Sequence, residues 1–136
     1  MDNRDALVKY RLEQAEQCLK SAKILLETND YKGAANRSYY CVFNSIRSLL
    51  AREGIDFKKH MAVINYFRKN YIKTNIFDVK LSDIAKNLFK IRTLSDYDDF
   101  YIVNKNNIIE QTTNAEYFLE QIKQYLKTIF EENLIK

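Results

Sequence analysis

The fold of this chain is decided by residues 34–51, which read AANRSYYCVFNSIRSLLA. Apolar side chains recur there at spacings of three and four residues, which is the period of one buried helix face. A second stripe lies about 100° round the same helix, taking 100° per residue as the step. A helix with two adjacent faces that both need cover is expected at the centre of a bundle or of a dimer. The first stripe consists of Ala35, Tyr39, Val42, Ile46 and Leu49, and the second of Asn36, Tyr40, Phe43, Arg47 and Leu50.

The composition around this helix favours an all-α fold. The chain has 136 residues, no proline and two glycines, so it lacks the turn residues that β-hairpins need. Gly54 is expected to cap the second helix, and Asp2 or Asn3 the first. We therefore predict an up-down antiparallel four-helix bundle with one short extra helix, in a single domain spanning residues 1–136. The apolar periodicity predicts helices over residues 4–27, 30–53, 59–70, 80–95 and 105–133.

Several classes of protein and site lack their signatures here. The chain has no apolar run of the roughly 20 residues that span a membrane, and residues 1–5 lack the regions of a signal peptide. A cytoplasmic protein without membrane contact is therefore predicted. Two cysteines and a single histidine, His60, offer no spaced set of metal ligands, and no glycine-rich phosphate loop occurs. We accordingly expect neither a metal nor a cofactor.

The positive charge of the chain is concentrated in its first half. Residues 1–68 hold twelve Lys or Arg against eight Asp or Glu, whereas residues 69–136 hold ten of each. Between Asp56 and Asp78 there is no acidic residue at all. This basic stretch is predicted either to bind phosphate groups or to be an ordinary solvated helix surface. Its cations are Lys58, Lys59, Arg68, Lys69 and Lys73.

The fourth predicted helix carries a polar exception on its apolar stripe. Arg92 stands where the stripe calls for an apolar residue, and Asp96 and Tyr97 follow at the end of the helix. A carboxylate four residues further on can reach back to the guanidinium. The group is interpreted either as an ion pair that ends the helix, or as a site where Arg92 holds a phosphate and Tyr97 supplies a hydroxyl.

Three segments, taken in order, resemble the HEPN superfamily and most of all its small stand-alone domains. They are the helix over residues 34–51 with its paired aromatics, the turn beginning His60-Met61-Ala62-Val63, and residues 92–97 with their Arg followed by Asp-Tyr. The resemblance implies a helical homodimer, often encoded beside a small nucleotidyltransferase in a toxin–antitoxin type module. It also implies that many relatives cleave RNA without a metal, at a cleft formed across the dimer.

The resemblance has one departure that bears on activity. In catalytic members four to six residues lie between the arginine and a histidine, whereas this chain has Tyr97, Asp98 and Asp99 at the positions where that histidine would fall. Histidine titrates near pH 6.5 and tyrosine near pH 10, so an unshifted tyrosine is a poor proton shuttle at neutral pH. The resemblance further implies that Asn36 is the polar residue of the second helix, which would face Arg92 if the second and fourth helices are neighbours. The second stripe on that helix and the common two-fold symmetry of oligomers predict that two copies pair through these two helices.

The sequence is compatible with three functions. The first is a homodimeric partner of a nucleotidyltransferase that presents Arg92, Asp96 and Tyr97 to a nucleotide or to RNA, with Tyr97 as an acceptor for nucleotide transfer. The second is a metal-independent endoribonuclease that uses Arg92 with Tyr97 or His60. The third is a purely structural or interaction domain. The candidate catalytic residues are Arg92, Asp96 and Tyr97, and the candidate binding residues are Asn36, Arg37, Tyr40, Arg47, Lys58, Lys59, His60, Arg68 and Lys69.

Overall fold

Helices account for most of the chain in the computed structural model, which describes residues 3–135, with side chains through residue 131. No strand occurs within that range, and the ends of the five predicted helices lie within three residues of their predicted positions. The all-α prediction is thus confirmed. The elements are α1 (Asn3–Glu27), α2 (Tyr31–Arg52), α3 (His60–Phe67), η1 (Arg68–Ile72), α4 (Val79–Tyr97) and α5 (Lys105–Ile135), of which η1 is a π-helical turn that continues α3.

The ends of α2 are set by local side-chain and backbone chemistry. The Asp30 carboxylate accepts a hydrogen bond from the backbone N–H of Gly33 at 2.9 Å, which satisfies one donor of the first turn. After α2 ends, Gly54 adopts φ 73°, a left-handed conformation that glycine enters without steric cost. The predicted cap at Gly54 is confirmed. For α1, the helix begins at Asn3, and Asp2 lies outside the described residues.

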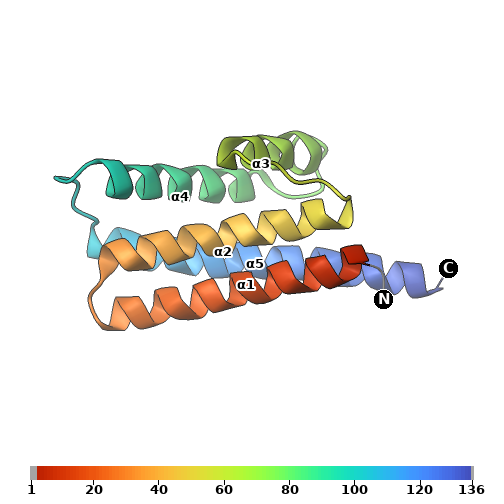
Figure 1. Cartoon of the computed structure of the whole chain (residues 1–136), viewed down its shortest axis with the longest axis horizontal. Helices are drawn as coiled ribbons and strands as arrows, with labels where there is room; N and C mark the ends of the chain where they lie inside the picture. The colour runs from red at the N-terminus through yellow and green to blue at the C-terminus, as the bar shows by residue number, and fades with distance from the viewer. Residues whose placement is uncertain (1–2, 136) are drawn as a thin grey trace.

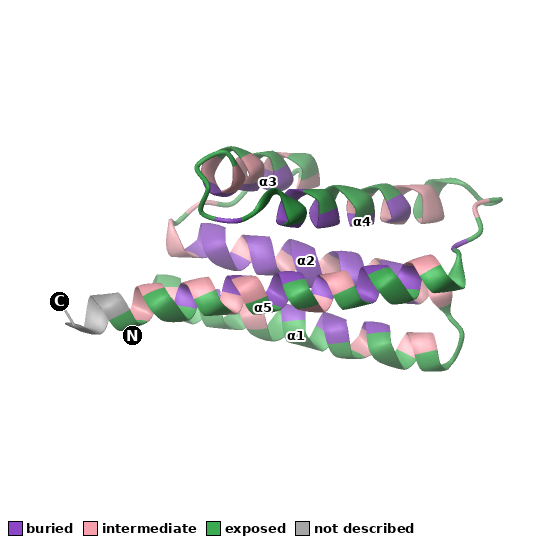
Figure 2. Cartoon of the chain, turned by 180° about the vertical axis from the view of Figure 1, so that it is seen from behind, coloured by how far each residue is buried: buried purple, intermediate pink, exposed green. Residues whose placement is uncertain are grey.

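Helix α2 lies at the centre of the bundle. In Figure 1 it runs between α1 on one side and α3 with α4 on the other, with α5 behind it, and it contacts all four. Figure 2 shows α2 as the most continuously buried helix, whereas α1 and α5 bury single stripes. Every residue of the first predicted stripe is buried. On the second stripe Phe43 and Leu50 are buried, while Asn36, Tyr40 and Arg47 stay half-exposed.

Polar side chains on the buried side of α2 find partners within the bundle. Ser38 shares a hydrogen bond of 2.8 Å with Thr112 of α5, and Ser45 donates to the backbone carbonyl of Cys41 at 2.7 Å. These small side chains let α5 approach α2 closely without leaving unsatisfied hydroxyls. The close packing fixes the face of α2 that remains beside α3 and α4.

No helix in the described part of the chain combines the length with the apolarity that a membrane span requires.

Candidate functional site

Arg92 lies between α4 and α2. It follows Leu81, Ile84 and Leu88 on the stripe that α4 packs toward the core, so its side chain is directed at α2. The guanidinium carbon lies 5.4 Å from the centre of the Tyr39 ring and 5.6 Å from that of Tyr40. These are distances of cation–π contact, and Nη2 also donates a hydrogen bond of 3.3 Å to the Tyr40 hydroxyl.

The predicted pair between Arg92 and Asp96 is present. Nε of Arg92 lies 3.0 Å from Oδ2 of Asp96, one helical turn further on. Among the described residues this buried Nε has no hydrogen-bond partner, so its contact with Asp96 lacks hydrogen-bond geometry. The contact is therefore an ion pair that leaves donors of the guanidinium available.

His60 begins α3 and packs against α2. Its ring stacks on Phe43, with centroids 4.2 Å apart, and its Nδ1 shares a hydrogen bond of 2.9 Å with the Tyr39 hydroxyl. Burial lowers the pKa of His60 below its usual 6.5, and the positive charges of Arg92 and Arg47 lower it further. The imidazole is thus neutral at pH 7, with one ring nitrogen as donor and the other as acceptor.

Tyr39 connects the two residues, so four side chains from three helices form one group, which we call the Arg92 cluster. It comprises Tyr39, Tyr40, His60 and Arg92. The Tyr39 ring contacts Arg92 while its hydroxyl contacts His60, and burial raises the pKa of that hydroxyl so that it stays protonated. Of the two predicted pairings of Arg92, the geometry favours His60, because Tyr97 is 80% exposed at the end of α4.

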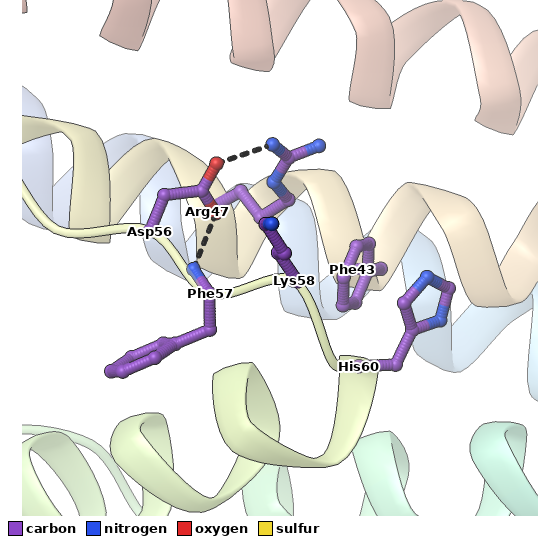
Figure 3. Close-up of a pocket in the computed structure, with 6 residues that line it drawn as sticks. All are labelled: Phe43, Arg47, Asp56, Phe57, Lys58 and His60. Carbon is purple, nitrogen blue, oxygen red and sulfur yellow. Dashed lines mark hydrogen bonds and ion pairs between the residues drawn. The ribbon is translucent and has the colours of Figure 1, made fainter.

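A polar pocket of about 360 Å³ adjoins the Arg92 cluster. Figure 3 shows its lining, in which the ring of Phe57 points away from His60 and Phe43. Arg47 donates through Nη2 to Oδ2 of Asp56 at 2.8 Å. The pocket is lined by Phe43, Arg47, Asp56, Phe57, Lys58 and His60.

Two residues near this pocket escaped the sequence reasoning. Arg11 of α1 lies 3.6 Å from the Asp56 carboxylate, on the same oxygen that Arg47 contacts. Arg11 precedes the apolar stripe of α1 and Asp56 lies in a link between helices, so neither position carries a periodic signal. Only the packing of α1 on α2 brings them together.

Asn36 and Arg37 form a local pair on α2. The Asn36 side-chain oxygen accepts from Nε of Arg37 at 3.2 Å and from its Nη2 at 2.9 Å. The Arg37 guanidinium also lies 5.4 Å from the centre of the Tyr40 ring, so Arg37 and Arg92 share that ring. Within residues 3–131 no hydrogen bond joins Asn36 to Arg92, although α2 and α4 are neighbours as the sequence reasoning required.

The predicted basic stretch divides between the two ends of α3. Lys58 lines the pocket and Lys59 is exposed just before the helix. At the far end Arg68 donates through Nε to Ser82 of α4 at 3.0 Å, and Lys69 is exposed. An eight-residue helix, about 12 Å long, separates the two pairs, so only the first pair adjoins the pocket.

Across the residues that the structure describes, no group of three His, Cys, Asp or Glu side chains is placed to hold an ion.

Comparisons with known proteins identify the family. A "UPF0332 protein" of Thermotoga maritima is 28% identical over 129 residues, which cover 95% of this chain and 98% of that protein. Methanocaldococcus jannaschii has a "Putative toxin MJ0142" that is 31% identical over 92% of this chain and 83% of its own length. Its "Putative toxin MJ0605" is 32% identical over 87% of each chain. The HEPN domain model matches residues 8–131, and the chain therefore belongs to the HEPN domain family.

Proposed function

We propose that this HEPN-domain chain is the RNA- or nucleotide-binding component of a toxin–antitoxin type module, acting as a homodimer with a small nucleotidyltransferase as its partner. The observation that carries the proposal is the convergence of Arg92, His60 and the Tyr40 hydroxyl around Tyr39. The names of two archaeal relatives, "Putative toxin MJ0142" and "Putative toxin MJ0605", support the module. The dimer and the enzyme partner rest on the family resemblance.

The chemistry of the Arg92 cluster suits a phosphate group. A guanidinium presents five N–H donors in a planar fork. Of the nitrogens of Arg92, only Nη2 donates a hydrogen bond to a described residue. The two tyrosine rings hold the guanidinium in place, which reduces the entropy lost when it binds an anion. The net charge of +4 adds a long-range attraction for nucleic acid.

Binding of labelled single-stranded RNA, followed by fluorescence anisotropy, tests this role. We expect Arg92→Ala to weaken affinity by about tenfold, since a charge-assisted hydrogen bond contributes roughly 1.5–3 kcal/mol. Lys86→Ala removes the same charge from an exposed position of the same helix and serves as the matched control. Equal losses in both variants would show that Arg92 acts only through net charge, and would remove the cluster from the proposal.

The partner role is supported by the end of α4. Tyr97 is 80% exposed and Phe100 in the following loop is 91% exposed, and large exposed apolar side chains mark contact sites for other proteins. The Tyr97 hydroxyl is open to attack the α-phosphorus of a nucleoside triphosphate held by the partner. That step forms a tyrosyl phosphodiester, expels pyrophosphate and releases the hydroxyl proton.

Co-expression with a nucleotidyltransferase encoded beside the gene tests the partnership. We expect a stable complex, a dimer of this chain by light scattering, and a nucleotidyl mass increment that is lost in Tyr97→Phe. Tyr101→Phe is the control, because Tyr101 lies in the same loop region but is half-buried. An increment that persists in Tyr97→Phe would contradict the assignment of the acceptor.

A second candidate function is a metal-independent endoribonuclease, favoured by the contact of both Arg92 and His60 with Tyr39. In this reading neutral His60 takes the proton from a ribose 2′-hydroxyl, whose oxygen attacks the adjacent phosphorus. Arg92 stabilises the charge that develops, and a 2′,3′-cyclic phosphate forms as the 5′-oxygen leaves with a proton from water, while His60 returns its own proton to the resulting hydroxide. Incubation with tRNA in EDTA should give cleavage that is lost in His60→Gln and Arg92→Ala but kept in Tyr97→Phe. Intact RNA with the wild-type protein would end this candidate.

A further inference from the structure

One carboxylate in the polar pocket faces several cations. Asp56 lies in the link between α2 and α3, and its Oδ2 is 2.8 Å from Nη2 of Arg47 and 3.6 Å from Nη2 of Arg11. Lys58 lines the same pocket. The single negative charge of Asp56 is thus set against three positive charges that come from α1, α2 and the link itself. An excess of positive charge remains for a second anion.

The same place has donors that Asp56 does not satisfy. Nε of Arg47 is buried and has no hydrogen-bond partner among the residues that the structure describes, while the guanidinium lies 5.8 Å from the centre of the Phe43 ring. A buried unpaired donor is unfavourable, so a ligand that reaches it gains a hydrogen bond without displacing another. Helix α3 also begins at the pocket without a side-chain cap, and its first turn adds partial positive charge.

We propose that Asp56 is an intramolecular stand-in for a phosphate group, and that Arg11, Arg47 and Lys58 bind a phosphate-bearing ligand when Asp56 moves aside. A phosphate has more acceptor oxygens than a carboxylate, and it pairs with Nη2 and Nε of one arginine at once. A pocket of about 360 Å³ falls in the range of roughly 300–1,000 Å³ that ligand sites occupy.

Asp56 limits the affinity of the pocket for phosphate. A bound phosphate and the Asp56 carboxylate compete for the same Arg47 nitrogen, so the affinity of the pocket is reduced by the cost of displacing Asp56. The source of the phosphate, a free nucleotide or an RNA chain, rests on the proposed function. The competition itself does not, because Arg92 takes no part in it.

Titration of the full chain with inorganic phosphate and with AMP, followed by NMR, tests the competition. Asp56→Asn should lower the dissociation constant of both probes at least about fivefold, which corresponds to ~1 kcal/mol. Asp83→Asn removes the same charge from an exposed position of α4 and is the matched control, for which we expect less than a twofold change. A parallel titration with a short single-stranded RNA identifies the source of the phosphate. If Asp56→Asn raises the affinity for RNA more than that for AMP, the ligand is a phosphodiester. If it raises the affinity for AMP more, the ligand is a free nucleotide.

Two further variants test which arginine binds the phosphate. Adding Arg47→Gln to Asp56→Asn should abolish the gain in phosphate affinity. Adding Arg92→Ala should leave that gain intact, even if RNA binding at the Arg92 cluster fails. Circular dichroism of each variant confirms that the helices are retained, and Asp56→Ser serves where Asp56→Asn does not fold. Equal effects of the Asp56 and Asp83 substitutions, or weaker phosphate binding after Asp56→Asn, would overturn the proposal.

Discussion

At the scale of single residues, His60 has the most restricted environment in the Arg92 cluster. It stacks on Phe43, shares a hydrogen bond with Tyr39, and faces the positive charges of Arg92 and Arg47. Burial of the ring and the positive charges of the two arginines each disfavour a second proton on it. His60 is therefore held as a neutral imidazole, which is the form required to accept a proton or to contact a ligand without repelling the arginines.

The titration of His60 is a direct test. We expect a folded pKa below 6.5, mainly because burial penalises the charged ring, and a rise in that pKa in Arg92→Gln, which removes a repelling charge. The shift of the ring proton resonances with pH in NMR measures both values. A pKa at or above 6.5 in the wild-type protein would mean that water reaches the ring freely.

The same shift predicts how stability depends on pH. The unfolded chain binds a proton at His60 near pH 6.5, whereas the folded chain binds it only at lower pH. Between the folded pKa and 6.5 the unfolded state holds more protons, so the free energy of unfolding rises with pH through this window. The stabilisation that neutral His60 contributes is lost as the pH falls through the same window. His60 is the only histidine, and urea unfolding at pH 5 to 7 should give a flatter profile for His60→Gln.

At the scale of elements, the end of α2 decides where the pocket lies. Gly54 turns the chain after the helix, and the link that follows carries Asp56 and Lys58 to the start of α3. The left-handed conformation of Gly54 is essential to that path, because its φ of 73° is one that residues with a Cβ rarely adopt. A change in the turn at Gly54 is consequently expected to move the pocket residues, because only four residues of chain lead from Gly54 to Lys58.

Substitution of Gly54 tests this coupling. Gly54→Ala should lower the free energy of unfolding by about 1–2 kcal/mol, since the left-handed conformation is unfavourable for alanine. Gly54→Asn is the control, because asparagine tolerates that conformation better while adding the same Cβ. That Cβ would lie 2.7 Å from Nη2 of Arg4 in either variant. Equal losses in chemical denaturation would indicate that crowding by Arg4, and not the backbone, sets the cost.

At the scale of the whole molecule, α2 serves both as the core and as the platform of the site. Its first stripe is buried in the bundle, where Tyr39 meets His60 of α3 and Arg92 of α4. Tyr40 and Arg47 on the adjacent face meet α4 and the link. The packing of the buried stripe therefore positions the residues of the site. A substitution that disorders the core is expected to disturb the Arg92 cluster, even where the substituted side chain does not contact the cluster.

Ile46 at the middle of the buried stripe provides the test. Its side chain is fully buried, so Ile46→Ala should cost about 2–5 kcal/mol through lost burial and the cavity left behind. Ile24→Ala removes the same atoms from a side chain that is 49% exposed and should cost far less. Thermal or urea unfolding measures both. Similar costs at the two positions would contradict the central place of α2.

Much of the architecture was predictable from the sequence by itself. The spacing of Tyr39, Val42 and Ile46 fixed a helix and its buried face, because burial repeats with the helical period of the backbone. The approximate helix ends followed from the same period, and the cap at Gly54 from the conformational freedom of glycine. The pairing of Arg92 with Asp96 was also accessible, since it depends only on positions four residues apart on one helix.

What only the tertiary structure decided is which distant residues meet. His60 and Arg92 lie on different helices, and both reach Tyr39 only because α3 and α4 pack on the same side of α2. Arg11 and Asp56 likewise meet through the packing of α1 against α2. Such contacts depend on the angles and distances between helices, for which periodicity within one helix holds no information. The sequence therefore determined the helices and their buried faces, and the packing between helices determined the site.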